Sequence, residues 1–300
     1  MKVECEAGGL KLANPTILAA GIMGTTGASL KRMAGMGAGA VVTKSIGVEP
    51  KYGHPNPTMI ALDGGYINAL GLPNPSYKEF SRELKVAKEA PVPVIASIFG
   101  ATADEFVEIA RGLPGADACE LNVSCPHAIG YGMQVGTDPA LVKSITKAVK
   151  DAVSVPVWVK LTPNVTDIRE IGLAAQEGGA DAVVAINTLK AMAIDVESGY
   201  PILGNVHGGL SGPAIKPVAV RCVFDLYDTL EIPVIAAGGV SNWADAAEMM
   251  MAGACAVEIG SAVHEDPGVF AAVAMGISDY LDRKSLQLND IVGMAHRVRK

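Results

Sequence analysis

The chain has 300 residues, 50% of them hydrophobic and 18% charged, so it can bury a large core and lacks the composition of a disordered protein. Its 24 basic and 31 acidic residues give a formal net charge of −7, which disfavours general nucleic-acid binding. No apolar run reaches the roughly 18 residues that span a bilayer and the first residues do not form a signal peptide, so we expect a cytoplasmic protein without a membrane segment.

Short apolar runs rich in β-branched residues alternate with helix-like stretches rich in Ala, Glu, Lys and Leu. Most runs lack polar alternation, as strands covered on both faces do. The pattern predicts an α/β fold, a TIM (β/α)8 barrel forming a single domain over residues 1–300. In chain order the expected strands are 17–20, 40–44, 94–97, 118–122, 157–160, 182–186, 234–237 and 256–259.

Before the first of these strands, residues 3–6 and 10–12 have the pattern of a small strand pair that turns at Gly8 and Gly9. We expect this pair to close the bottom of the barrel. The spacing between strand starts is longest after the second, fourth and sixth strands, at the face where a barrel carries its chemistry. The long loops 45–75, 123–138 and 187–217 are therefore expected to build the active site.

Cys125 opens the second of these loops, just past a strand end and before a proline, where a thiol can meet a ligand. The chain has five cysteines and no C-x-x-C pair, so neither a disulfide framework nor a zinc ribbon fits. Cys119 and Cys255 lie in or beside expected strands and Cys222 in a helix-like stretch, which suits buried structural thiols. Cys125 is the cysteine expected to do chemistry.

Three asparagines, Asn68, Asn122 and Asn187, occur at strand ends or in the long loops. Each amide is both a donor and an acceptor, so together they favour a planar, amide-rich ligand such as a pyrimidine or a flavin ring. Lys44 and Lys160 end two apolar strands. Such a lysine can form a Schiff base, bind an anion or balance negative charge on a reduced cofactor, and the sequence does not separate these.

The seventh and eighth strands end in glycines, in Gly238-Gly239 and Gly260-Ser261. Backbone N–H groups in these two loops form the usual phosphate site of this fold. The histidines show no metal-binding spacing and carboxylates do not cluster at strand ends, so no metal site is expected.

Six motifs, in order along almost the whole chain, resemble dihydroorotate dehydrogenase. The combination of an asparagine-cysteine motif with the loop Ser-Gly-Pro-Ala is highly specific. The motifs are Asn-Ala-Leu-Gly-Leu-Pro-Asn at 68–74, Asn-Val-Ser-Cys-Pro at 122–126, Val-Lys-Leu-Thr-Pro-Asn at 159–164, Asn-Thr-Leu-Lys-Ala-Met-Ala-Ile-Asp at 187–195, Gly-Gly-Leu-Ser-Gly-Pro-Ala at 208–214 and Gly-Gly-Val at 238–240.

The resemblance implies an FMN enzyme that oxidises (S)-dihydroorotate to orotate in de novo pyrimidine (UMP) synthesis. It implies the soluble class 1 type, with Cys125 as the base that takes the C5 proton while hydride leaves C6 for flavin N5. The implied substrate residues are Lys44, Asn68, Ala69, Leu70, Gly71, Leu72, Asn122, Asn187 and Thr188. The implied FMN residues are Ala20, Lys44, Ser45, Ser97, Asn122, Lys160, Ile186, Gly212, Gly238, Gly239, Gly260 and Ser261, with Lys160 offsetting charge on the reduced ring and the last four binding phosphate.

Two positions depart from the family pattern: His127 and Ser97 stand where relatives usually or often have asparagine. The stretches Val-Thr-Lys-Ser, Gly-Thr-Asp-Pro and Asn-Val-Ser-Cys-Pro look most like the NAD-linked (class 1B) catalytic subunit. That likeness implies a homodimer core and a separate iron-sulfur flavoprotein subunit carrying FAD and a 2Fe-2S cluster, because this chain has no iron-sulfur motif of its own.

Other interpretations stay open at this point. A fumarate-linked class 1A enzyme shares the motifs, and a dihydropyrimidine dehydrogenase-like barrel reducing uracil or thymine shares the cysteine and the asparagines. A lyase or aldolase with Lys44 or Lys160 as Schiff base is a different class of enzyme. A barrel serving only as a partner subunit leaves these residues unexplained.

Overall fold

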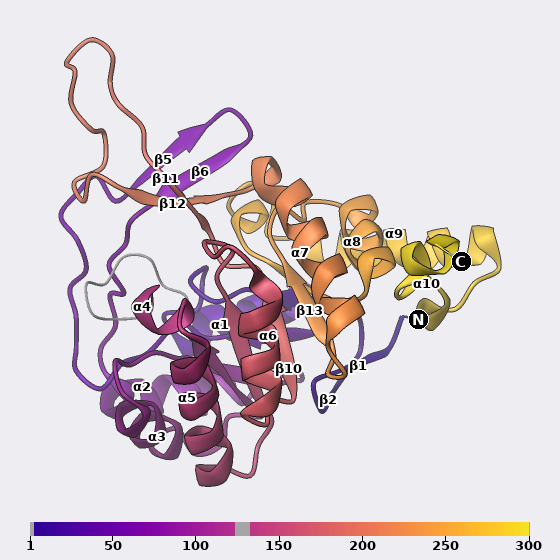
Figure 1. Cartoon of the computed structure of the whole chain (residues 1–300), viewed down its shortest axis with the longest axis horizontal. Helices are drawn as coiled ribbons and strands as arrows, with labels where there is room; N and C mark the ends of the chain where they lie inside the picture. Colours follow the sequence, from indigo (N-terminus) through magenta and orange to yellow (C-terminus); the bar gives the residue numbers. More distant parts are fainter. Residues whose placement is uncertain (1–2, 124–132, 300) are drawn as a thin grey trace.

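Eight parallel strands close into a barrel in the computed structural model, which describes residues 3–123 and 133–299 (Figure 1). Around the barrel the strand order is β10, β13, β14, β3, β4, β7, β8 and β9. The predicted TIM barrel is confirmed, and every strand overlaps its predicted run. The strands are β3 (Thr16–Leu18), β4 (Ala40–Val42), β7 (Val94–Ile98), β8 (Ala118–Asn122), β9 (Val157–Leu161), β10 (Ala182–Ala185), β13 (Val234–Ala237) and β14 (Ala254–Ile259).

A helix follows each barrel strand and packs on the outside of the barrel. Several helices begin where a side chain accepts the free N–H groups of the first turn, as Thr26, Thr102, Asp138, Asp167 and Asn242 do. These caps fix the point at which the chain leaves each loop. The helices are α1 (Gly27–Gly35), α2 (Tyr77–Ala87), α3 (Ala103–Gly112), α5 (Pro139–Ala152), α6 (Ile168–Glu177), α7 (Lys216–Thr229), α8 (Trp243–Ala252) and α9 (Val269–Lys284).

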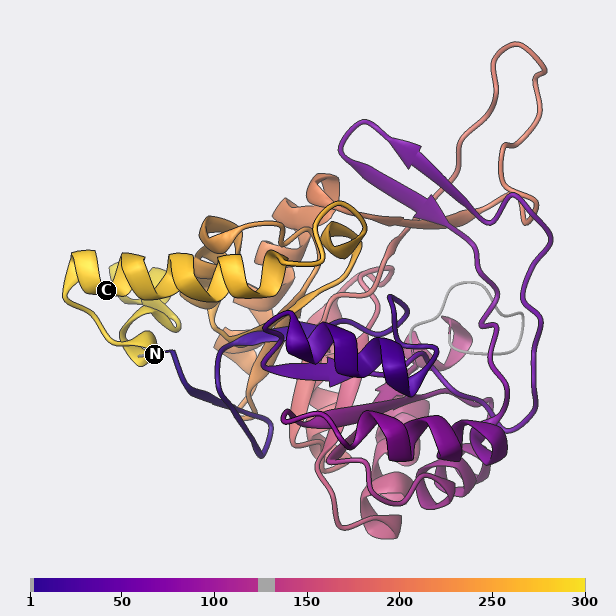
Figure 2. The same ribbon diagram turned by 180° about the vertical axis from the view of Figure 1, so that it is seen from behind.

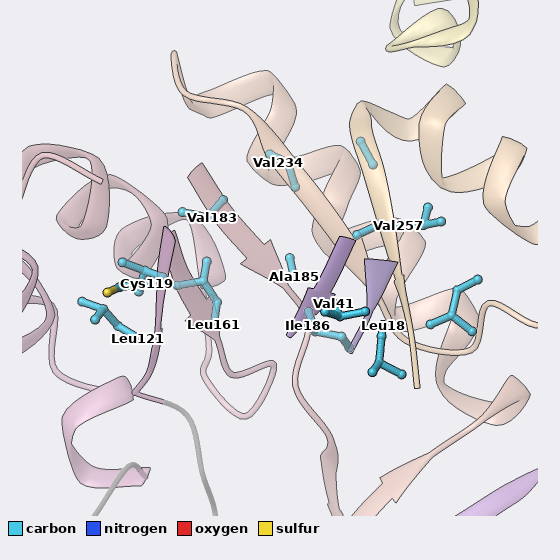
Figure 3. Packing of buried hydrophobic residues seen from close by; sticks show 14 of the residues in the cluster. Leu18, Val41, Cys119, Leu121, Leu161, Val183, Ala185, Ile186, Val234 and Val257 are labelled. Carbon is cyan, nitrogen blue, oxygen red and sulfur yellow. The ribbon is translucent and has the colours of Figure 1, made fainter. Parts of the chain in front are cut away.

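The side chains of each barrel strand alternate between two cores. One set, which includes Leu18, Val41 and Leu161, packs between the strands and the outer helices (Figure 3). The other set, which includes Ile17, Val42 and Val184, fills the barrel interior. Both faces of each strand are therefore buried, which explains why the strands appear in the sequence as continuous apolar runs.

The hairpin of β1 (Cys5–Ala7) and β2 (Leu10–Leu12) closes the bottom of the barrel, as predicted. Gly8 and Gly9 form its turn with φ of +49° and +84°. The indole Nε1 of Trp158, inside the barrel, donates a hydrogen bond of 2.9 Å to the Gly8 carbonyl. The lower half of the barrel is thus filled by apolar side chains, and a ligand must enter from the other end.

Two of the long segments form a second sheet rather than loops, which corrects the sequence-based expectation. Its antiparallel order is β11 (Leu189–Ala191), β12 (Gly208–Ser211), β6 (Gly65–Asn68) and β5 (Met59–Leu62). The sheet joins parts of the loops 45–75 and 187–217 and projects beyond the barrel (Figure 1). Its strands are short and partly exposed, so they carry no continuous apolar signal.

The two chain ends lie near each other, away from this second sheet (Figure 2). The remaining short elements of the described chain are α4 (Met133–Gly136), α10 (Leu288–Ile291) and the 3-10 turns η1 (Pro213–Ile215), η2 (Ser261–His264) and η3 (Met294–Arg299).

Candidate active site

A cavity of about 400 Å³ lies at the carboxyl ends of the barrel strands, between the barrel and the second sheet. Residues that follow β3, β4, β10, β13 and β14 line it, together with residues within β6, β8, β9 and β12. Its position is where barrels of this kind carry their chemistry. The cavity therefore unites the first and third long segments, as the sequence predicted, although part of their chain is strand.

Most of the residues that the resemblance assigns to cofactor and substrate line this one cavity. They come from positions up to 241 residues apart in the sequence, and only barrel closure brings them together. They are Ala20, Lys44, Ser45, Asn68, Leu70, Gly71, Leu72, Asn122, Lys160, Ile186, Asn187, Thr188, Gly212, Gly238, Gly239, Gly260 and Ser261.

Two assigned residues do not line the cavity. Ser97 is fully buried in β7, and its hydroxyl shares a hydrogen bond of 3.0 Å with the hydroxyl of Ser45, which does line it. Ala69 is fully buried beneath the second sheet with Ile67 and Leu203. Ser97 can act on a ligand through Ser45, and Ala69 supports the loop that carries Leu70 to Leu72.

Cys125, the predicted base, and His127 lie outside the described residues. The other four cysteines are described. Burial raises the pKa of Cys5, Cys119 and Cys255 to about 12 and that of Cys222 to about 11. At neutral pH these thiols are protonated, which agrees with the structural role expected for three of them.

Polar side chains at the strand ends form one hydrogen-bonded chain along the cavity wall. Asn122 Nδ2 donates to Ser45 Oγ at 2.9 Å, and Asn122 Oδ1 accepts from Asn187 Nδ2 at 3.3 Å. The Oδ1 of Asn187 in turn accepts from the backbone N–H of Thr188 at 2.8 Å. The contacts orient two of the three predicted asparagines, so their amides are fixed before a ligand arrives.

The third asparagine, Asn68, ends β6 in the second sheet, where its amide donates to the Gly209 carbonyl at 3.4 Å. The same sheet contributes Tyr66, whose hydroxyl donates to Glu265 Oε1 at 3.4 Å beyond β14. The sheet is therefore tied to the barrel rim on the far side of the cavity. Tyr66 and His264 also line the cavity and were not predicted. Nothing in the local sequence shows that β6, which carries Tyr66, pairs with β12, or that His264 in η2 faces the cavity.

The glycine turns after β13 leave backbone exposed to the cavity. Gly238 and Gly239 have φ of +122° and +77°, which favour glycine over other residues. A Cβ at Gly239 would lie 2.7 Å from the Lys216 Cβ and 2.9 Å from the Gly212 carbonyl oxygen. The tight packing and the positive φ values therefore restrict this turn to glycine, and both glycines line the cavity.

Lys160 on β9 is the charged centre of the cavity floor. Its Nζ donates to Glu258 Oε2 on β14 and lies 3.6 Å from Glu120 Oε2 on β8. Burial by itself lowers the pKa of Lys160, but the charges of Glu120 and Glu258 outweigh it and raise that pKa above its ordinary value. Lys160 is therefore an ammonium, which disagrees with the Schiff-base alternative, because imine formation needs the free amine.

The meeting of Glu120 and Glu258 at Lys160 was not recognised from the sequence. Glu120 and Glu258 are in β8 and β14, two strands that are not neighbours in the barrel, so no spacing in the sequence links them. A signal was present in each strand alone. A glutamate inside an otherwise apolar, fully buried strand needs a partner, and Glu120 and Glu258 are both such residues.

Comparison with known proteins finds one family model that matches the chain, described as "Dihydroorotate dehydrogenase", over residues 2–281. Curated proteins named "Dihydroorotate dehydrogenase B (NAD(+)), catalytic subunit" are similar over nearly their whole length. That of Methanocella arvoryzae is 76% identical, with 100% of both chains covered. That of Methanosarcina mazei is 65% identical, with 97% of this chain and 94% of the relative covered. That of Pyrococcus horikoshii is 50% identical, with 99% and 98% covered.

Among solved structures, a crystal structure of the enzyme DHODH from Eimeria tenella in complex with ferulenol has the same fold. It superposes with a TM-score of 0.85 at 24% identity, covering 99% of this chain and 89% of the other. Within the described residues, no helix is both long and apolar enough to cross a membrane.

Proposed function

The chain belongs to the dihydroorotate dehydrogenase family, a family of flavin-dependent enzymes, and from this we propose that it oxidises (S)-dihydroorotate to orotate with bound FMN in de novo pyrimidine synthesis. The observation that carries the proposal is the convergence of Asn68, Asn122 and Asn187 with Lys44 and Lys160 on a single cavity. Oriented amides suit the pyrimidine ring and the flavin ring alike, and two ammonium groups suit a carboxylate and a reduced flavin.

The cavity fits FMN by volume and by chemistry. Its volume of about 400 Å³ lies within the range of small-molecule and cofactor sites. At one end, Gly238 and Gly239 line the cavity in the turn after the seventh barrel strand, where barrels of this kind usually hold a phosphate, and packing against Lys216 and Gly212 leaves no room for a Cβ at Gly239. On the wall, the fixed amide of Asn122 supplies the donor and acceptor that an isoalloxazine edge pairs with.

In this proposal the phosphate is held by Gly238, Gly239, Gly260 and Ser261, and the ring by the residues at the other strand ends. Those are Ala20, Lys44, Ser45, Asn122, Lys160, Ile186 and Gly212, with Ser97 supporting Ser45 from below. When bound, the flavin supplies an acceptor for the hydride of the substrate. The Lys160 ammonium stabilises the negative charge that reduction brings to the cavity.

The substrate is held in this proposal by the amides of Asn68, Asn122 and Asn187, with Thr188 and residues 70–72 completing its pocket. The Lys44 ammonium pairs with the carboxylate of dihydroorotate. The second sheet covers the cavity on the solvent side and limits water at the reacting atoms. Cys125 takes the C5 proton, a role that rests on the family motif at 122–126 and suits a thiol whose pKa can be tuned towards neutral pH.

We also propose that the electrons pass to NAD through a second, iron-sulfur flavoprotein subunit that carries FAD and a 2Fe-2S cluster. The support is the name shared by the relatives above, which describes a catalytic subunit of an NAD-dependent enzyme. A homodimeric core and a cytoplasmic location belong to the same proposal.

The experiment that tests the reaction is an anaerobic titration of the purified yellow protein with dihydroorotate, followed by bleaching of the visible flavin band. Bleaching is expected with dihydroorotate and not with dihydrouracil, which lacks the carboxylate. A bound flavin that dihydroorotate leaves oxidised would remove this substrate from the proposal. Adding NAD or fumarate to the reduced protein, with and without a co-purified flavoprotein subunit, then identifies the acceptor.

A further inference from the structure

Glu120 and Glu258 approach the Lys160 ammonium from opposite sides of the barrel. Three strands separate β8 from β14 in either direction around the barrel, so both carboxyls reach into the interior to meet the same nitrogen. Both glutamate side chains are 0% exposed, and that of Lys160 is 8% exposed. Lys160 and Glu258 line the cavity, and Glu120 lies behind them.

The hydrogen bonding of these groups is incomplete if both carboxyls are ionised. Among the described residues, no donor reaches Glu120 Oε1, Glu120 Oε2 or Glu258 Oε1. One ammonium would then face two carboxylates, and this buried group would carry a net charge of −1, which a dry interior strongly disfavours. A single proton on one carboxyl removes the net charge and supplies the missing donor between the two glutamates.

The electrostatics of Glu258 agree with this arrangement. Burial first, and the charge of Glu120 second, raise the pKa of Glu258 well above its ordinary range, although Lys160 opposes the rise. Because both carboxyls approach the same nitrogen, a proton on Glu258 can be held between the two side chains. The other titratable side chains that line the described part of the cavity are Lys44, Tyr66 and His264.

We propose that Glu120 and Glu258 share one proton at neutral pH and form with Lys160 an electroneutral trio that keeps the ammonium charged and sets the reduction potential of the flavin. The inference rests on the proposed function for its flavin. Glu120 and Glu258 are positioning residues that act through Lys160, whereas Lys160 faces the ligand. Because the trio is neutral, the ammonium stabilises the reduced flavin without the opposing field of an extra carboxylate.

The first test measures the midpoint potential of FMN bound to the purified chain, by equilibration with a reference dye and without dihydroorotate. Glu120→Gln and Glu258→Gln each remove one carboxyl, and the other then ionises opposite Lys160. The net charge does not change, so each single variant should alter the ratio of reduced to oxidised flavin by less than about threefold. The double variant leaves the ammonium unbalanced and should favour reduced flavin by at least about tenfold, about 30 mV for a two-electron couple.

Glu177→Gln is the matched control, since Glu177 pairs with Lys143 on the exposed helix surface and its loss should not move the potential. If both carboxyls are ionised in the wild type, each single variant removes a full charge and favours reduced flavin by tenfold, which overturns the shared proton. If the potential is unchanged in the double variant, the proposed effect of the trio on the reduction potential of the flavin is wrong.

The second test does not depend on bound flavin, in either the wild type or the variants. Infrared difference spectra between wild type and each single variant at neutral pH should contain the carbonyl stretch of one protonated carboxyl, which is absent from the difference with Glu177→Gln. A wild-type protein without that band contradicts the proposal even if dihydroorotate reduces the flavin. A chain that has the band but binds no FMN contradicts the proposed function instead, so the two failures are distinguishable.

Discussion

The side-chain amide of Asn122, at the end of β8, donates a hydrogen bond of 2.9 Å to the hydroxyl of Ser45, in the segment that follows β4. These two residues are 77 positions apart, and their contact joins two walls of the cavity. Because Asn122 also accepts from Asn187, its amide cannot turn over without losing both bonds.

Asn122→Ala should therefore weaken ligand binding more than it lowers the stability of the fold. We expect a loss of about 1–2 kcal/mol in unfolding free energy, as for a lost buried hydrogen bond, and at least a tenfold weaker binding of orotate. Chemical denaturation and the orotate-induced change in the flavin spectrum measure the two effects. Ser45→Ala removes only one of the bonds and should weaken orotate binding less, and equal losses in the two variants would argue against the bridging role of Asn122.

Lys160→Met removes the cation of the cavity floor and leaves Glu120 and Glu258 without it. Breaking a buried ion pair by removing one partner typically lowers the unfolding free energy by about 3–5 kcal/mol. The loss should be smaller here, because the two carboxyls can take up protons. We expect a lower unfolding free energy that recovers towards acidic pH. FMN binding, measured by fluorescence titration, should weaken at least about tenfold, and unchanged retention and reduction of FMN would remove Lys160 from the site.

Cys125→Ser tests the residue that the family motif assigns as the base. The variant should keep its flavin and lose most dihydroorotate oxidation at pH 7, because a serine hydroxyl has a far higher pKa than a thiol. Activity should rise towards alkaline pH as the deprotonated fraction of the hydroxyl increases. Single-turnover flavin reduction across a pH series measures this, and wild-type rates at pH 7 would be incompatible with the assignment.

Thiol labelling separates Cys125 from the other cysteines. Burial raises the pKa of Cys5, Cys119 and Cys255 to about 12 and that of Cys222 to about 11, so almost none of these thiols is ionised at pH 8. Iodoacetamide on the native protein should leave these four unmodified, as judged by peptide mass mapping, and should modify Cys125. Modification of all five cysteines at similar rates would contradict the burial of these four thiols in the native protein.

Gly239→Ala tests the glycine turn proposed to bind the phosphate. Its φ of +77° and the contact of a new Cβ with Lys216 at 2.7 Å require the turn to shift. We expect a loss of about 1–3 kcal/mol in unfolding free energy and weaker FMN retention. Gly35→Ala is the steric control, because Gly35 lies in helix α1 and a Cβ there meets nothing within 4 Å, so its melting temperature should not fall below that of the wild type.

Much of the architecture was predictable because it depends on local patterns. Strands such as β8 and β9 are buried on both faces, so they appear as apolar runs, and the glycines of the β1–β2 turn mark it directly. Asn122, Asn187 and Lys160 were recognisable because polar residues at the ends of such runs must point to the mouth of a barrel. The second sheet was not predictable in this way, since β6 and β12 are short and partly exposed, and they pair although Asn68 and its partner Gly209 are 141 residues apart.

The sequence by itself determined the barrel, the face that carries the chemistry and most of the residues around the cavity, because burial and turn geometry are encoded within each βα unit. Only the tertiary structure decided which of those residues meet. Glu120 and Glu258 come from opposite strands of the closed barrel, and no local spacing relates them. Closure in a dry interior brings two carboxyls to one ammonium, and the resulting charge balance is a property of the assembled site rather than of any segment.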